Sequence, residues 1–153
     1  MKSNFKLTQA HLSAWFGEFN RDYFGGKLPE PRLMLSRSRT QLGSMRCKRR
    51  AGLGRVETFD YAIHVSILFE QDEKGFKNVL LHEMIHYYIG VHQWRDTSAH
   101  GRLFRQMMND INERFGRQVT VSHQSTKAQR EQAVDNVPHY HVVAVVRFKD
   151  GRV

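Results

Sequence analysis

The chain opens with a stripe of large apolar residues at helical spacing. They recur every three or four positions and so share one face of an α-helix: Leu12, Trp15, Phe16 and Phe19. Thr8 precedes the stripe and can cap a helix, whereas Gly25-Gly26 interrupts the pattern. We therefore predict an N-terminal helix that buries its aromatic face in a core.

From Arg32 to Val65 the helical spacing gives way to short apolar pieces separated by polar and glycine residues. This alternation predicts three short strands of a small sheet, at residues 33–35, 42–45 and 61–65. In the third strand, Tyr61, Ile63 and Val65 fall on one face, and we expect His64 on the other face to be exposed to solvent.

Two more helical patterns follow. After a polar link at residues 71–75, the apolar residues from Val79 onward predict a helix that ends at Gly90. Thr97 or Ser98 can cap the next helix, which ends near Phe115-Gly116. Its apolar face consists of Leu103, Phe104, Met107, Met108 and Ile111.

The C-terminal residues lack this regularity. Residues 119–121 predict a short strand, and a continuous apolar run at residues 142–146 predicts another. We expect one domain over residues 1–121, followed by a tail over residues 122–153 that contains a strand and represents a degenerate or truncated ribbon-like appendage.

Composition narrows the class of protein. With 153 residues, 40% of them hydrophobic, the chain can bury a core of its own. Its single cysteine, Cys47, excludes an internal disulfide framework and a cysteine-based zinc finger, and it fits a cytoplasmic location. The N-terminus lacks the apolar run of a signal peptide, and no stretch is long and apolar enough to span a membrane.

The charge is strongly positive and concentrated in one segment. The net charge is +9, and residues 32–55 contain no Asp or Glu but eight cations: Arg32, Arg37, Arg39, Arg46, Lys48, Arg49, Arg50 and Arg55. We predict that Lys48-Arg49-Arg50 forms an exposed basic loop. Together with Arg46, this loop is a candidate contact for the phosphates of DNA, which would place the protein at the nucleoid. The alternative is a solvated hairpin tip.

The candidate metal ligands and a candidate catalytic base lie together in the helix predicted from Val79 onward. It contains the sequence His82-Glu83-Met84-Ile85-His86, an instance of His-Glu-x-x-His. Two histidines four residues apart lie on one helix face and can bind one ion, typically zinc with a third protein ligand and one open position. Glu83, displaced around the helix, can take a proton from a water molecule at that position.

The residues alone leave two candidates for the third ligand. His92 follows His86 by six residues, as in the longer pattern His-Glu-x-x-His-x-x-Gly-x-x-His. That pattern requires glycine where this chain has Ile89. His100 begins the second apolar helix, and Gly101 beside it would let the backbone approach closely. Spacing favours His100 only slightly.

Two motifs together resemble the SprT-like family of zinc metallopeptidases, which includes the eukaryotic protease Spartan. His-Glu-Met-Ile-His is present at residues 82–86, and the family's His-Gly-x-x-Phe element is present as His100, Gly101 and Phe104. The similarity extends over about residues 8–125, from Phe19-Asn20 and the turn at residues 24–28 to Ile111-Asn112. A position that is often proline in the family is Arg102 here.

The resemblance implies His82, His86 and His100 as ligands of one Zn²⁺ and Glu83 as the catalytic base. It also implies an α+β, zincin-like metalloprotease domain with a small antiparallel sheet packed on the metal-binding helix and neighbouring helices. Many family members continue into a zinc ribbon with paired cysteines, which this chain lacks after Cys47.

We therefore expect a zinc metalloendopeptidase whose protein or peptide substrates are associated with DNA or crosslinked to it. The main alternative is a non-catalytic DNA-binding or transcription-associated protein with a structural zinc. A zinc hydrolase of small molecules fits the charge less well. Oligomeric state does not follow from the sequence.

Overall fold

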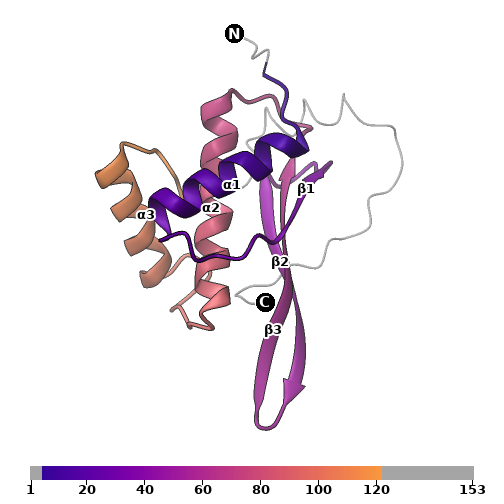
Figure 1. Ribbon diagram of the computed structural model, residues 1–153, viewed down its shortest axis with the longest axis vertical. Helices are drawn as coiled ribbons and strands as arrows, with labels where there is room; N and C mark the ends of the chain where they lie inside the picture. Colours follow the sequence, from indigo (N-terminus) through magenta and orange to yellow (C-terminus); the bar gives the residue numbers. More distant parts are fainter. Residues whose placement is uncertain (1–4, 122–153) are drawn as a thin grey trace.

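The computed structural model describes residues 5–121 and forms an α+β domain of three helices and one small mixed sheet. The element order is α1 (Gln9–Tyr23), β1 (Arg32–Ser36), β2 (Gly43–Gly52), β3 (Arg55–Ser66), α2 (Glu73–Val91) and α3 (Arg102–Phe115). The three helices lie on one side of the sheet (Figure 1). Within residues 5–121, no helix combines the length and apolarity needed to cross a membrane.

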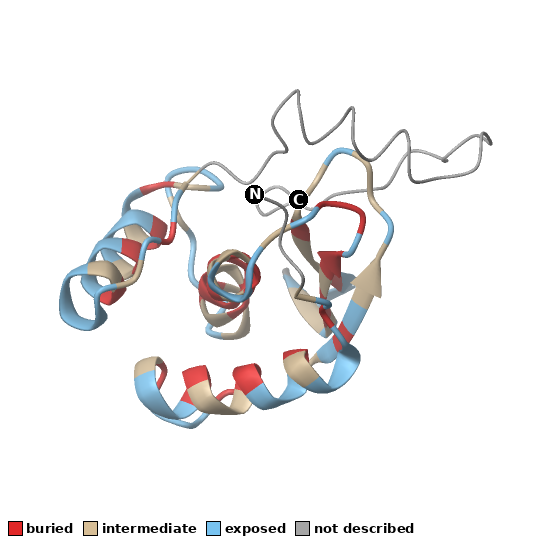
Figure 2. Ribbon diagram, turned by 90° about the horizontal axis from the view of Figure 1, so that it is seen from above, coloured by how far each residue is buried: buried red, intermediate tan, exposed pale blue. Residues whose placement is uncertain are grey.

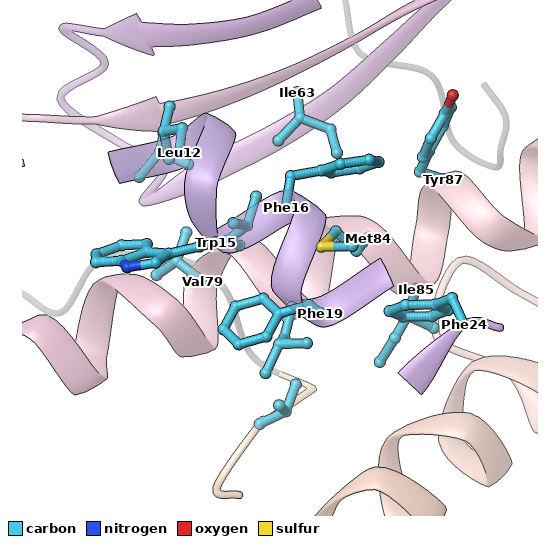
Figure 3. Close-up of a cluster of buried hydrophobic side chains, with 14 of the residues drawn as sticks. Leu12, Trp15, Phe16, Phe19, Phe24, Ile63, Val79, Met84, Ile85 and Tyr87 are labelled. Atoms are coloured by element: carbon cyan, nitrogen blue, oxygen red, sulfur yellow. The ribbon is translucent and has the colours of Figure 1, made fainter. Parts of the chain in front are cut away.

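Helix α1 has the predicted start and the predicted buried face. Thr8 is its N-cap and accepts a hydrogen bond from the His11 amide, while the His11 ring accepts one from the Thr8 amide. This reciprocal pair satisfies two amides that a helix N-terminus otherwise leaves unbonded. Its buried face packs into the core beside α2 (Figure 3) and includes Leu12, Trp15, Phe16 and Phe19.

Helix α2 is the centre of the domain. Seen end-on it lies between α3 and the sheet, with α1 running across below it (Figure 2). Residues 79–85 are all buried, so α2 is covered on nearly every side and not on one face alone. It begins at Glu73 with Asp72 as N-cap, so the predicted polar link at 71–75 is largely helical. It also continues past Gly90 to Val91, which corrects the predicted end.

The sheet is mixed, which corrects the expected antiparallel arrangement. The strand order is β1-β3-β2, with β2 antiparallel to β3 and β1 parallel to it. β3 runs antiparallel to its hairpin partner β2 and in the same direction as β1, and β1 pairs with the edge of β3 that β2 leaves free. The sequence contains the strands but does not specify which edge β1 joins.

The β2–β3 hairpin is longer than the predicted strands and projects from the domain (Figure 1). Lys48, Arg49 and Arg50 are exposed residues within β2 and not in a loop, which corrects that prediction. The register shifts between Arg46 and Lys48, and Asp60 on β3 has a φ of 54° there, which indicates a β-bulge. We call residues 48–59, beyond this bulge, the hairpin arm.

Two smaller predictions are also wrong. His64 is half-buried, and its Nδ1 atom is inaccessible to solvent. Residues 119–121 form no strand, because other groups take their backbone hydrogen bonds: the Asn112 side chain bonds the amide and carbonyl of Val119. The strand predicted at residues 142–146 and the rest of the tail lie outside the described residues.

Candidate metal centre

Three histidine side chains converge between α2 and the start of α3. The Nε2 atom of His100 lies 3.2 Å from Nε2 of His82 and 3.2 Å from Nε2 of His86. Among residues 5–121, these three form a group whose ligand atoms lie within 4.8 Å of one another and could hold a metal ion. His82 is buried, whereas His86 and His100 are partly accessible.

The spacing of the three nitrogens fits a metal ion. Tetrahedral zinc binds imidazole nitrogens at about 2.0–2.1 Å, which separates two such ligands by about 3.3 Å. Hydrogen bonds among the rings cannot replace the ion. His82 Nδ1 lies 2.8 Å from the Thr120 carbonyl and must donate to it, so Nε2 of a neutral His82 is an acceptor. The single proton that His100 Nε2 can carry cannot serve both neighbouring nitrogens.

A chain of hydrogen bonds orients His82. The side-chain amide of Asn112 on α3 bonds both the carbonyl and the amide of Val119, each at 2.9 Å. This clamp places the next carbonyl, that of Thr120, where it accepts the Nδ1–H of His82. The bond fixes the tautomer of His82 and directs Nε2 toward the other two rings, the usual role of groups behind metal ligands.

His100 is held by the segment that caps α3. Both carboxylate oxygens of Asp96 accept amide hydrogens from the first turn of α3, at 3.0 Å from Leu103 and 2.8 Å from Phe104. The Thr97 hydroxyl oxygen accepts from the Arg102 amide at 3.1 Å. Burial alone would raise the pKa of Asp96, but the backbone hydrogen bonds outweigh it and lower that pKa.

Gly101 fits this capping segment because it has no side chain. A Cβ atom there would lie 2.2 Å from Thr97 Oγ1 and 2.4 Å from Asp96 Oδ1. Phe104, one turn into α3, is fully buried and packs against all three histidine rings, with centroid distances of 4.8, 4.6 and 4.8 Å to His82, His86 and His100. The His-Gly-x-x-Phe element thus supplies a candidate ligand in His100, a close backbone contact at Gly101 and, in Phe104, a ring against which the three histidines pack.

Glu83 lies beside the histidines and is almost completely buried, with 3% of its surface exposed. Burial raises the pKa of its carboxyl group to about 7, although the charges of His82 and His100 act in the opposite direction. The start of β2 packs closely on this part of α2: a Cβ at Gly43 would lie 2.8 Å from Val79 Cγ1 and 3.3 Å from Glu83 Cγ. The Gly43 backbone therefore packs closely against the side-chain stem of Glu83.

His92, the competing third-ligand candidate, lies outside the cluster. Its Nδ1 contacts the Tyr88 carbonyl at 2.8 Å, and its ring packs against Tyr88 and Trp94 at the C-terminal end of α2. Tyr87 is a packing residue. It is 2% exposed, and its hydroxyl donates to the Pro29 carbonyl at 2.5 Å. Burial raises the pKa of Tyr87 to about 12.

Two of the four predicted DNA-contact residues form ion pairs with acidic side chains of β3. Lys48 pairs with Asp60 at 3.0 Å, and Arg50 pairs with Glu57 at 3.3 Å, so acidic residues of β3 face the cations of β2. Arg49 is exposed on the same arm. Arg46 is half-buried, on the domain side of the bulge, and burial lowers the pKa of its guanidinium.

Sequence reasoning missed three groups that position the site: the Asp96 carboxylate, the Asn112 side chain and the Thr120 carbonyl. An aspartate shortly before a helix is a signal that could have identified the first. The other two act through a backbone clamp for which a single sequence has no specific pattern.

The fold and the site define an α+β domain with a candidate histidine metal centre. The chain matches the model of the SprT-like family over residues 12–123. The protein therefore belongs to the SprT-like family, which is associated with metallopeptidase-like domains. Comparison with curated proteins gives no match.

Proposed function

We propose that the protein is a zinc-dependent metalloendopeptidase with a zincin-like domain. The observation that supports this proposal is the convergence of three histidine Nε2 atoms, two of them 3.2 Å from the third, beside the buried carboxylate of Glu83. A closed structural site would not need a buried acid next to an open coordination position. The family membership is consistent with peptidase activity.

His82, His86 and His100 would hold the zinc ion. Bound there, zinc supplies Lewis acidity that polarises the scissile carbonyl and acidifies water. Glu83 accepts the proton of the attacking water and delivers it to the nitrogen of the leaving amine. Burial of Glu83 and the close approach of Gly43 to its Cγ atom restrict this side chain, so we expect little reorganisation when the proton moves.

Metal content and proteolysis, measured on the same samples, test this proposal. We expect about one zinc per chain in the wild type and in His92→Ala, and loss of zinc in His100→Ala. Glu83→Gln should retain zinc and lose cleavage of an unfolded protein substrate. Zinc retained in His100→Ala would contradict the ligand set. Cleavage that survives in Glu83→Gln would contradict the mechanism, and a wild type that binds zinc but cleaves nothing would favour a non-catalytic zinc protein.

We further propose that the substrates are proteins associated with DNA or crosslinked to it. The net charge of +9 and the exposed cations of the hairpin arm support this proposal. The ion pairs on the arm are exposed and hold these cations weakly, because exposed pairs contribute only about 0–1 kcal/mol. Phosphate oxygens can therefore compete with Asp60 and Glu57 for Lys48 and Arg50.

This proposal is tested by measuring DNA binding and DNA-stimulated cleavage as a function of salt concentration. Replacing Lys48, Arg49 and Arg50 by Gln should make the slope of log K for DNA binding against log salt concentration shallower by up to about 3, because each lost phosphate contact removes about 0.9. The control replaces three exposed cations elsewhere in the domain, Arg21, Lys27 and Lys74, and removes the same charge. An equal effect in both triple variants would show that net charge, and not the arm, attracts DNA. If DNA does not stimulate cleavage at low salt, this substrate class is wrong.

A further inference from the structure

The tip of the hairpin arm is apolar although it is exposed (Figure 1). Residues 51–54 carry no polar side chain, Leu53 is completely exposed at 104%, and Val56 is 58% exposed. The turn itself does not require leucine: Gly54 supplies the positive φ, 75°, and hairpin turns favour glycine, asparagine or aspartate. Leu53 therefore gains free energy from burial only when another molecule covers the tip.

The stem behind this tip is basic, which restricts the partner. Residues 48–59 include four cations and a single acid, Glu57. Arg49 and Arg50 are consecutive in β2, so their side chains project from opposite faces of the arm. Arg50 pairs with Glu57 at 3.3 Å, but the pair is exposed and therefore weak. A complementary partner presents negative charge on both sides of the arm and apolar groups at its end.

The dimensions of the arm match the major groove of duplex DNA. This groove is about 12 Å wide and about 8.5 Å deep and admits a two-stranded ribbon, whereas the minor groove is only about 6 Å wide. Strand residues rise about 3.3 Å each, so Leu53 lies about 10 Å beyond Arg50 along the arm and about 13 Å beyond Arg49. With Leu53 at the floor of the groove, both arginines reach the phosphates at its rim. The apolar groups at that floor are the C5-methyl groups of thymine.

We propose that the hairpin arm enters the major groove of duplex DNA tip first, with Leu53 against thymine methyl groups and Arg49 and Arg50 on the phosphates of the two strands. This inference rests on the proposed association with DNA. It adds the groove that is occupied, the residue that contacts the bases, and a preference for thymine. The arginines supply an attraction that depends on salt, and Leu53 supplies one that does not.

The test measures binding to two duplexes of the same A·T-rich sequence, one with thymine and the other with uracil, which lacks the C5-methyl group. Leu53→Ala removes only exposed atoms and so leaves the fold intact. It should weaken binding to the thymine duplex about tenfold, as loss of a buried leucine side chain does. The slope of log K against log salt concentration should stay that of the wild type, because no phosphate contact is lost.

The uracil duplex isolates the contact between Leu53 and the methyl groups. The wild type should bind it about fourfold more weakly than the thymine duplex, the effect of one apolar carbon, whereas Leu53→Ala should not distinguish the two duplexes. Ile67→Ala is the matched control, because Ile67 is an aliphatic residue that is 39% exposed outside the arm. It should bind both duplexes as the wild type does.

Three results would overturn the inference. One is wild-type affinity in Leu53→Ala, combined with loss of affinity when residues 48–50 are replaced, which would leave the association with DNA in place and refute only the groove contact. Another is an equal preference for thymine in the wild type and in Leu53→Ala. The third is binding to anionic phospholipid vesicles, and not to DNA, that depends on Leu53. A wild type that binds neither duplex at low salt would instead refute the association with DNA, and the inference with it.

Discussion

Gly101 offers a sharp test of how the third histidine is positioned. Replacing it by Ala places a methyl group within 2.2 Å of Thr97 Oγ1, 2.4 Å of Asp96 Oδ1 and 2.7 Å of the Ser98 amide nitrogen. The backbone itself is not the obstacle, since Gly101 has a φ of −87° that alanine adopts readily. The cost is therefore steric, and it falls on the two side chains that cap α3 and on the backbone at Ser98.

The magnitude follows from the contacts that must break. Forcing the methyl group into this space costs about 1–3 kcal/mol, and loss of the cap adds about 0.5–2 kcal/mol. We expect a total near 3 kcal/mol, which corresponds to a fall of roughly 10 °C in Tm for a domain of this size. Because His100 directly precedes Gly101, the histidine moves as well, and zinc affinity should fall about 10–100-fold, as when a group that orients a ligand is lost.

Thermal unfolding with a chelator measures the first effect, and zinc competition with a chromophoric chelator measures the second. Gly17→Ala is the control, because the nearest atom to its added Cβ is the end of the Arg21 side chain at 3.7 Å. In the middle of α1 it should stabilise the protein by about 0.5–1 kcal/mol. If Gly101→Ala keeps the Tm and the zinc affinity of the wild type, the capping segment does not position His100.

Replacing Asn112 by Leu removes both hydrogen bonds to Val119, so zinc affinity should fall about 10–100-fold, and unchanged affinity in the same competition assay would show that the clamp is dispensable. Tyr87→Phe removes the donor to the Pro29 carbonyl and should lower the free energy of unfolding in urea by about 1–2 kcal/mol without changing zinc content; loss of zinc would contradict a packing role. Burial raises the pKa of Glu83 from 4.5 to about 7, so the folded, metal-free protein keeps a proton that the unfolded chain has lost. The contribution of this group to stability is thus present below pH 4.5 and is lost as the pH rises to about 7. The free energy of unfolding, measured with chelator present, should fall between pH 5 and pH 7 in the wild type but not in Glu83→Gln. An equal change in both proteins would refute this assignment.

The helices were largely predictable because their signals are local. Thr8 and the aromatic stripe fix the start and the buried face of α1, and Phe115-Gly116 marks the end of α3, where Gly116 has a φ of 66°. The first turn of α2 is polar and was predicted as a link, so its N-cap Asp72 was not identified. The predicted end of α2 was wrong because Gly90 is tolerated inside the last turn, where its carbonyl accepts the Tyr61 hydroxyl at 3.0 Å.

The sheet was less predictable because strand pairing is not local. The residues of β1 favour a strand but do not specify its neighbour or its direction. The outer half of β2 carries Lys48, Arg49 and Arg50, which do not alternate with apolar residues, so the binary pattern suggests a loop. Pairing with β3 makes this segment a strand, with Arg50 opposite Glu57.

The candidate site likewise has parts that local sequence signals predict and parts that depend on contacts distant in the sequence. The spacing of His82 and His86 places them on one helix face from the sequence alone, whereas spacing favours His100 over His92 only slightly and the family resemblance is what identifies His100 as the third ligand. The structure brings His100 to the other two and leaves His92 at the far end of α2. The clamp by Asn112 was beyond prediction, because it depends on how residues 117–120 return across α2.

The hairpin arm is an almost independent unit of the molecule. Beyond Thr58, which bonds Gln93, its strands pair mainly with each other, and the Leu53-Gly54 turn is fully exposed. An isolated two-stranded hairpin is only marginally stable in water, so the outer arm can open and close without unfolding the core. Its amides should therefore exchange with deuterium long before those of α2. The arm could accordingly change in length or in charge, in evolution or by design, while the three histidines keep their places.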